Sequence, residues 1–259
     1  MNIPIPEDLK GSIVRDVQDF DSIPPELSFV FSAITMPKKE QIKEVELKYA
    51  KKGIPVISNN SAHRWTSDVP MILGEINPDH VNVIPIQQKN RGYDKGFIAV
   101  KPNCSLQSYL TPIFALEKAG YKIEKLIVTT LQAVSGAGYP GVPSLDVIDN
   151  IVPYIGGEEE KTETEPSKIL GKVGENGIIP DESIQISATC TRVSVSDGHT
   201  ASVNMKFKEK IPSKEEIIKI WTEFKSEPQK LNLPYAPLHP IIYLDNIDRP
   251  QPKKDRDND

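Results

Sequence analysis

Short apolar runs separated by polar stretches of helix length mark the first hundred residues of the chain. Four of these runs have the length of a strand, at 27–34, 54–58, 81–85 and 97–101. The stretch that opens at Pro37 instead repeats its apolar residues at helical spacing, and Gly53 ends it. Strands that alternate with a helix predict a parallel sheet of the α/β type.

The pattern changes beyond residue 104. Ser105–Ala119 predicts a helix with a kink at Pro112, because proline cannot donate its backbone hydrogen bond. A long β-rich run covers 125–134, and two later runs, 183–195 and 200–207, alternate like strands of a mostly antiparallel sheet with one face in water. A capping box predicts one more helix, in which the cap and its acidic partner are Ser213 and Glu216.

Composition narrows the classes of protein. With 259 residues, 38% of them hydrophobic and 26% charged, the chain is typical of a globular protein. Its net charge of −5 argues against non-specific nucleic-acid binding, and no apolar run approaches the ~20 residues of a membrane span. Residues 1–10 lack the pattern of a signal peptide. The acidic run Glu158–Lys161 is, by default, a solvated helix face.

Two cysteines and four histidines supply the candidate chemistry. Cys104 lies between a predicted strand and a helix N-terminus, where free N–H groups favour a thiolate, although a buried, inert cysteine is the simpler interpretation. Cys190 lies within a strand and reads as structural. His199, in a turn between strands, could act as a base, but turn histidines are more often solvated. His63 lies beside Arg64, and we interpret it as a residue of the cleft wall and not as a base. With no disulfide framework or metal cluster, we expect a cytoplasmic protein without a metal site.

A glycine-rich turn invites a different interpretation. Gly136, Gly138 and Gly141 satisfy the G-x-G-x-x-G pattern after a predicted strand. Pro140 and Pro143 would break the helix that must follow, and no acidic residue ends a strand ~20 positions later. We therefore reject a dinucleotide fingerprint and predict a turn that allows a close backbone approach to a ligand.

In their order along the chain, five strings resemble aspartate-semialdehyde dehydrogenases of the archaeal and fungal type. The strings are SNNSAHR (58–64), PNCS (102–105), LQAVSGAGYPGVPSLDVIDNIVPYIGGEEEK (131–161), RVSVSDGHT (192–200) and DRPQPKKDRD (248–257). The resemblance implies an α/β + α+β fold: a partial Rossmann-like NADP-binding domain at 1–103, a catalytic and dimerisation domain with a large mixed, mostly antiparallel sheet at 104–247, and a return segment at 248–259.

The resemblance also implies a role for each matching residue. Cys104 is the nucleophile, His199 the acid/base, and Gln132 orients the acyl group. Arg192 pairs with the substrate carboxylate through its planar guanidinium, and Glu158 holds the substrate amino group. Inorganic phosphate is bound by Arg64, Asn103 and Lys161. The cofactor NADP is lined by Ser32, Ala33, Ser135, Gly136, Ala137 and Gly138.

The reaction so implied is the reversible, NADP-dependent reductive dephosphorylation of aspartyl 4-phosphate to aspartate 4-semialdehyde, on the route to lysine, methionine and threonine. In the dehydrogenase direction a thiolate adds to the aldehyde, hydride leaves to the nicotinamide while His199 takes the hydroxyl proton, and phosphate cleaves the thioester. The implied partners are a small-molecule substrate and phosphate, in a homodimer or homotetramer. We expect neither nucleic acid nor membrane as a partner.

Departures from the family pattern lie at both ends of the chain. The family's opening strand and G-x-[TSA]-G-x-[VI]-G phosphate loop are missing, and so is most of its return segment. We therefore expect a chain truncated at both ends that binds NADP weakly or not at all. Ser194 and Ala201 replace a usual proline and glutamate beside His199, where we expect tuning of the site and not its loss.

Three alternatives stay open at the level of sequence. A malonyl-CoA reductase would keep the cysteine chemistry but not need phosphate. A cysteine hydrolase or acyltransferase built on Cys104 and His199 would need no nicotinamide. A non-catalytic, dimerising fragment would form no acyl-cysteine at all.

Overall fold

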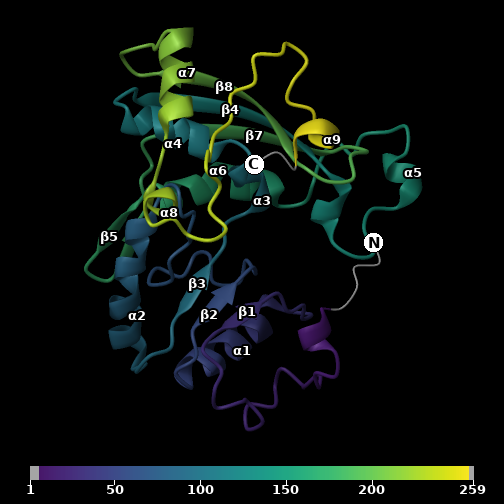
Figure 1. Cartoon of the computed structure of the whole chain (residues 1–259), viewed down its shortest axis with the longest axis vertical. Coiled ribbons are helices and arrows are strands. Elements are labelled where there is room, and N and C mark those ends of the chain that lie inside the picture. The colour runs from purple at the N-terminus through teal and green to yellow at the C-terminus, as the bar shows by residue number, and fades with distance from the viewer. Residues whose placement is uncertain (1–5, 257–259) are drawn as a thin grey trace.

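Two three-stranded sheets, one in each half of the molecule, organise the chain (Figure 1). The computed structural model describes residues 6–256. Parts of two segments discussed above, the start of 1–10 and the end of 248–259, lie outside the described residues.

The first half contains the predicted parallel sheet. Its strands β1 (Val30–Ser32), β2 (Val56–Ser58) and β3 (Ile98–Val100) pair in that order. Helix α1 (Lys39–Lys51) connects β1 to β2, and Gly53, with a φ of 85°, allows the chain to turn after it. Three of the four predicted strands and the first helix are therefore confirmed.

The fourth predicted strand, at 81–85, is wrong. This segment forms a 3₁₀ turn, η2 (Pro78–Val83), that continues into helix α2 (Ile84–Arg91). Proline suits the first turn of a helix because its missing N–H needs no partner there. Gln87 of α2 is buried and bonds both the N–H and the carbonyl of Ile98, at 2.7 and 2.9 Å, which fixes the helix against β3. A short apolar run does not by itself distinguish a strand from a helix.

The second half contains a mixed sheet around a long central strand. Strand β4 (Ile123–Gln132) pairs in parallel with β7 (Gln185–Arg192) and antiparallel with β8 (Thr200–Phe207). The expected mixed sheet is confirmed, although only one of these two ladders is antiparallel. Alternate residues of β4 are buried, so Gln132 faces the interior while Ile127 faces the solvent.

The helix predicted at 105–119 is divided in two. Helix α3 (Cys104–Gln107) ends after one turn, and α4 (Leu110–Lys118) begins after a break at residues 108–109. The break precedes Pro112, which therefore lies in the first turn of α4 and not at a kink inside a helix.

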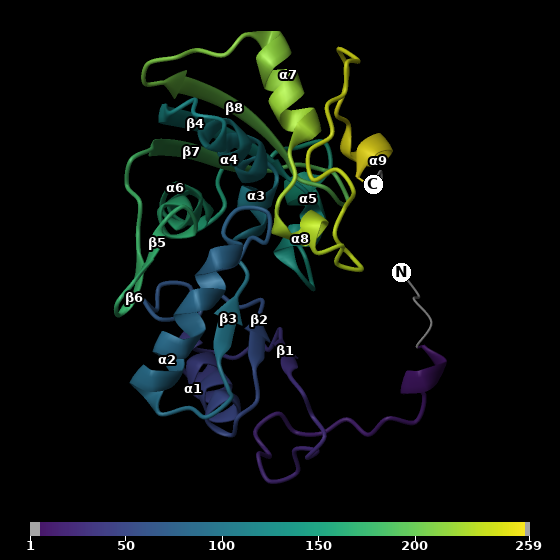
Figure 2. The ribbon, with the colours of Figure 1, turned by 60° about the vertical axis from the view of Figure 1, so that its left-hand side comes forward.

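Helix α7 (Lys214–Glu223) begins with the predicted capping box, in which the Glu216 N–H donates to Ser213 Oγ at 3.2 Å. Trp221 Nε1–H donates to the Pro112 carbonyl at 3.0 Å and ties α7 to α4. Helix α6 (Glu158–Ile169) covers β7 (Figure 2). The remaining elements are η1 (Glu7–Leu9), η3 (Val134–Ala137), α5 (Ser144–Val147), β5 (Lys172–Gly174), β6 (Gly177–Ile179), α8 (Glu227–Lys230) and α9 (Pro252–Asp255).

Within residues 6–256, no helix is both long and apolar enough to cross a bilayer. In the same part of the chain, no three His, Cys, Asp or Glu side chains group so as to hold a metal ion. The rejected dinucleotide fingerprint forms η3 and an irregular turn, with no long helix directly after it.

Candidate active site

Residues far apart in the sequence meet where β4 ends. Gln132 and Arg192 are register partners at the last positions of the parallel strands β4 and β7. Strand β8 runs antiparallel and begins at Thr200, which brings His199 to the same edge. Arg192 Nη1 donates to Gln132 Oε1 at 3.4 Å and to the Ala133 carbonyl at 2.9 Å. The sheet therefore places three of the predicted site residues together.

Cys104 reaches this edge from the other half of the molecule. Its neighbour Asn103 caps α3, because the Oδ1 atom accepts the N–H of Ser105 at 2.8 Å. The Cys104 sulfur lies 3.3 Å from His199 Nε2. Helix α3 has only four residues, so its dipole contributes less to a thiolate than a long helix would. The imidazole of His199 is therefore the main hydrogen-bond donor to the sulfur.

A backbone contact sets the tautomer of His199. The Ala133 N–H donates to His199 Nδ1 at 3.0 Å. A neutral imidazole with Nδ1 as its acceptor carries its proton on Nε2, which faces Cys104. Burial lowers the pKa of His199 from its ordinary 6.5, and the positive charges of Arg192 and Lys101 lower it further. At neutral pH the imidazole is therefore a hydrogen-bond donor to the sulfur.

The glycine-rich turn packs against the same two side chains. A β-carbon added at Gly136 would lie 2.9 Å from both Arg192 Nη1 and His199 Cε1. We predicted that this backbone closely approaches a ligand; at Gly136 it closely approaches the side chains of Arg192 and His199. The rest of the turn, Ser135, Ala137 and Gly138, is exposed. It forms an open wall beside the imidazole.

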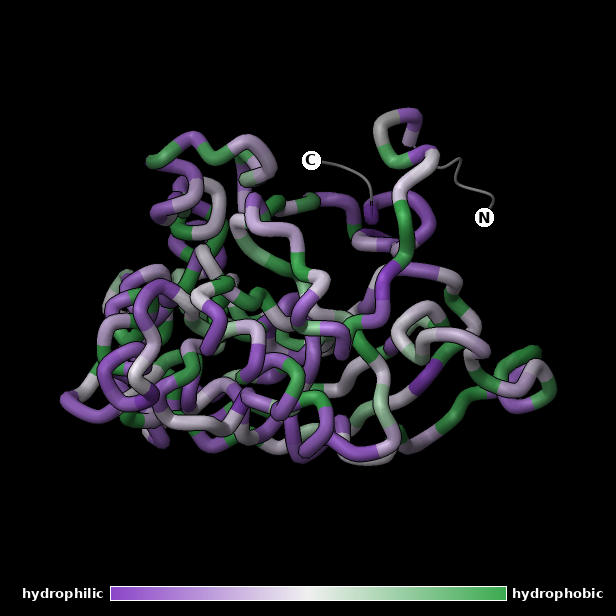
Figure 3. Tube along the Cα trace, turned by 90° about the horizontal axis from the view of Figure 1, so that it is seen from below, coloured by the Kyte–Doolittle hydropathy of each residue, from purple (hydrophilic) through white to green (hydrophobic). Residues whose placement is uncertain are grey.

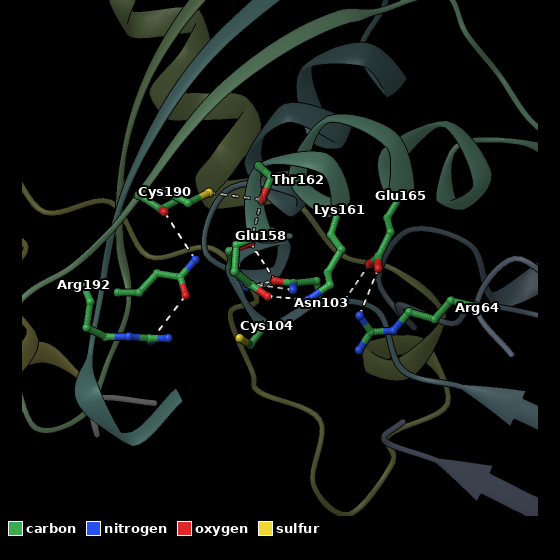
Figure 4. A network of polar contacts seen from close by, with 12 residues as sticks. Arg64, Asn103, Cys104, Glu158, Lys161, Thr162, Glu165, Cys190 and Arg192 are labelled. Carbon is green, nitrogen blue, oxygen red and sulfur yellow. Dashed lines mark hydrogen bonds and ion pairs between the residues drawn. The ribbon is translucent and has the colours of Figure 1, made fainter. Parts of the chain in front are cut away.

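The start of α6 supplies a hydrogen-bonded carboxylate. Glu158 accepts hydrogen bonds from Lys161 Nζ at 2.6 Å and from Asn103 Nδ2 at 2.8 Å. Burial would raise the pKa of Glu158, but the hydrogen bonds from Lys161 and Asn103 outweigh it, and the pKa is lowered. The Glu158 side chain is only 12% exposed and contacts Asn103 (Figure 4), so the interpretation as a solvated face is wrong for this residue, whereas Glu160 is exposed.

Arg64 lies on the far side of Cys104 from Arg192 in the view of Figure 4. It is 7% exposed, donates from Nη1 to Glu165 Oε1 at 2.9 Å, and donates from Nε to the Lys101 carbonyl at 3.0 Å. The Lys101 ammonium is half-buried near Cys104; burial lowers the pKa of Lys101, and the sulfur opposes that shift.

Sequence reasoning missed Glu165 and Lys101. One signal was available, because four charged residues recur at helical spacing on one face of α6: Glu158, Lys161, Glu165 and Lys168. Lys101 carries no such pattern, and only the fold brings it near Cys104.

Other candidates lie elsewhere. Ser32 and Ala33 are at the carboxyl end of β1, where open α/β sheets bind ligands, and the Ser32 hydroxyl is bonded to Glu46 at 2.6 Å. His63 is buried, with its Nε2 atom 3.8 Å from Glu46 Oε2, and burial lowers its pKa to about 4. Cys190 is fully buried in β7, as predicted.

Two family models match the chain. One is described as the NAD binding domain of semialdehyde dehydrogenases and matches residues 2–84, and the other as their dimerisation domain and matches residues 111–259. Among curated relatives, the aspartate-semialdehyde dehydrogenase of Aspergillus fumigatus is 45% identical over 83% of this chain. That of Methanothermobacter thermautotrophicus is 42% identical over 95% of it.

A solved structure shares the fold. The crystal structure of aspartate-semialdehyde dehydrogenase with NADP from Candida albicans superposes with a TM-score of 0.86, at 34% identity, over 99% of this chain. The chain spans 60% of the Aspergillus relative, 70% of the Methanothermobacter relative and 72% of the Candida chain.

Proposed function

The chain belongs to the aspartate-semialdehyde dehydrogenase family, and from this premise we propose that it converts aspartyl 4-phosphate to aspartate 4-semialdehyde through a thioester on Cys104. The reaction is reversible and uses NADP. The observation that carries the proposal is the 3.3 Å contact between the Cys104 sulfur and His199 Nε2, in a site with an arginine on each side.

Substrate recognition follows from the charges around the sulfur. Arg192, at the end of β7, binds the substrate carboxylate, and Glu158 binds the amino group, because each has the opposite charge to its target. Arg64 and Lys161 supply positive charge on the phosphate side. Asn103 uses both ends of its amide within the protein, so its part is to hold α3 and Glu158 in place.

The residues then account for acyl transfer. The Cys104 thiolate attacks the acyl carbon, a C–S bond forms, and the bond from the acyl carbon to the phosphate oxygen breaks. Phosphate leaves toward Arg64 and Lys161. His199 Nε2–H donates to the oxygen that gains negative charge. In the opposite direction the same N–H stabilises the alkoxide formed when Cys104 adds to the aldehyde. The resting tautomer favours this donor role over the base that the resemblance implies.

The chain's own residues fit a nicotinamide cofactor. Ala33 is exposed at the carboxyl end of β1, and the exposed turn at 135–138 packs beside His199. The turn would hold the cofactor on the side of the imidazole that contacts Cys104. When bound, NADP supplies or accepts the hydride.

We propose that the chain pairs with a second copy in the cytosol. Ile127 and Leu131 are exposed on the open face of β4. More exposed apolar residues lie on the loop around α5, which projects at the right of Figure 3: Tyr139, Leu145, Ile148, Ile151 and Tyr154. Apolar surface of this extent marks an interaction site. The match to a dimerisation domain over 111–259 supports a homodimer, on which a tetramer can be built.

A cofactor-independent half-reaction tests the function. Aspartyl phosphate mixed with the protein should release phosphate and acylate Cys104, as followed by intact-mass and peptide mass spectrometry. Malonyl-CoA should not, because its acyl carbon is bonded to a thiol sulfur and releases no phosphate toward Arg64 and Lys161. Acylation by malonyl-CoA alone would favour the acyl-CoA reductase. Immediate hydrolysis of the thioester would favour a hydrolase, and no acylation by either compound would favour a non-catalytic role.

A further inference from the structure

Glu165 is a buried carboxylate at the junction of the two halves. It lies seven residues after Glu158 on the same face of α6 and is 1% exposed. Its Oε1 accepts from Arg64 Nη1 at 2.9 Å, and its Oε2 accepts the backbone N–H of Asn103 at 2.7 Å. The carboxylate is buried, unlike that of Glu158, and both of its oxygens accept from protein donors, so it acts through these neighbours and not on a substrate.

The contact with Asn103 bears directly on the nucleophile. Asn103 immediately precedes Cys104, and its side chain bonds both Ser105 and Glu158. With its backbone held by Glu165, the residue before the sulfur is fixed from three directions (Figure 4). Two carboxylates of a single helix thus locate the start of α3.

The contact with Arg64 crosses from one half of the molecule to the other. A buried guanidinium needs a paired negative charge. The position of the Glu165 carboxylate therefore sets the orientation of the Arg64 guanidinium. Lys168, one turn further along α6, donates to the carbonyls of Arg64 and Thr66 at 2.6 and 2.7 Å. Arg64 in turn donates to the carbonyl of Lys101, three residues before Cys104. Helix α6 therefore holds both the arginine and the nucleophile loop.

We propose that Glu165 is a positioning residue, which sets the distance between the Cys104 sulfur and the Arg64 guanidinium. This inference rests on the proposed function, in which the sulfur attacks an acyl phosphate whose phosphate Arg64 receives. A phosphate leaving group requires both groups at a fixed separation, whereas a small alkylating reagent requires only the sulfur.

Glu165→Gln separates these two requirements. Both partners of Glu165 can only donate, and an amide has a single oxygen, so one contact becomes a donor facing a donor. We expect acylation of Cys104 by aspartyl phosphate to slow about tenfold to a hundredfold, the size of effect that small misplacements produce. Alkylation of Cys104 by iodoacetamide should change little. Loss of folding would alter both reactions together and expose Cys190 to the reagent.

Glu163→Gln is the matched control. Glu163 lies on the same helix and accepts a backbone N–H at 2.9 Å, but its partner, Ala188, lies in β7. This variant should retain the wild-type rates of both reactions. If Glu165→Gln does not fold, Glu165→Asp is the second variant. It keeps both carboxylate oxygens but places them one methylene further from Arg64 and Asn103. It should show the same separation of rates in milder form.

Hydrogen exchange of the peptide that contains Asn103 provides a readout independent of activity. Exchange should be faster in Glu165→Gln than in Glu163→Gln, because the Asn103 N–H loses its acceptor. Equal exchange and equal acylation in the two variants would overturn the proposal. If the wild-type protein is not acylated at all, the proposed function fails, and the exchange measurement still decides whether Glu165 holds the loop.

Discussion

Burial and nearby charges together set the protonation of His199: burial lowers its pKa, Arg192 and Lys101 lower it further, and Glu158 raises it. The Ala133 N–H donates a hydrogen bond to Nδ1, so Nδ1 must be unprotonated to accept it. Arg192 and Lys101 add positive charge near the ring. Each of these opposes a second proton on His199. The lowered pKa therefore favours, near neutral pH, the neutral ring with its N–H toward the sulfur.

Replacing one of those cations should raise the pKa of His199. Lys101→Met removes a positive charge while keeping the length of the side chain, so the pKa should move up toward 6.5. The shift can be measured by NMR titration of the imidazole Cε1–H, with the His199 signal assigned from its absence in His199→Asn. Lys125→Met, on the exposed side of β4, should leave the titration unchanged. A downward shift in Lys101→Met would contradict the account.

Gly136 packs so closely against His199 and Arg192 that a side chain there should move both residues. It does not adopt a left-handed φ, so alanine is compatible with its backbone, yet the added methyl would displace His199 and Arg192. We expect Gly136→Ala to slow acylation of Cys104 roughly tenfold or more, with little change in the free energy of unfolding. Gly156→Ala is the comparison, because its new methyl meets no atom within 4 Å. Equal rates in the two variants would show that the turn does not support the imidazole.

At the scale of elements, the sequence was informative where one local signal determined the outcome. Strand β4 and the capped helix α7 follow from alternation and from a capping box, and both form as predicted. The segment at 81–85 leads into a helix whose first turn contains Pro85, and the Gln87 contacts that hold this helix against β3 are ones that no local pattern reveals.

The site divides in the same way. Cys104 and His199 were identified from motifs and resemblance, and the fold brings them together. Glu165, in contrast, contacts Asn103, which lies 62 residues earlier in the chain. Its role depends on how α6 docks against the other half of the molecule, so periodicity could at best have marked its face of the helix.

The cap of α7 should contribute to stability alone. Ser213→Ala removes the oxygen that accepts the Glu216 N–H and should lower the free energy of unfolding by about 1 kcal/mol in urea titrations. Acylation of Cys104 should be unchanged, because Ser213 is exposed at the start of a helix that packs against α4. Thr222→Ala in the same helix removes a hydroxyl that bonds only within α7 and should cost less. A full loss of acylation in Ser213→Ala would mean that α7 and the site are coupled.

At the scale of the whole molecule, the mixed sheet has one face that the described chain leaves uncovered. Alternation along β4 places Gln132 toward the catalytic interior and Ile127 toward the solvent. One strand thus serves the site on one face and offers an apolar surface on the other. In a homodimer, pairing of these surfaces would stabilise the strand that positions Gln132.

A charge on that surface should separate the two copies. Ile127 is 61% exposed, and Ile127→Lys should shift the protein from dimer to monomer in light scattering after size-exclusion chromatography. Ile179, 62% exposed on the β5–β6 hairpin, is equally accessible but outside the proposed surface, so Ile179→Lys should remain dimeric. A wild-type protein that is monomeric at all concentrations would rule out the surface.

The central claim is that the contact from His199 Nε2 makes the Cys104 sulfur the reactive nucleophile of the chain. The direct measurement is the rate of iodoacetamide alkylation at each cysteine near neutral pH, with buried Cys190 as the internal reference. We predict rapid reaction at Cys104, none at Cys190 in the folded protein, and a loss of about tenfold at Cys104 in His199→Asn, the worth of a hydrogen bond to a charged group. A Cys104 that reacts no faster than Cys190, or at the same rate in His199→Asn, would contradict the account.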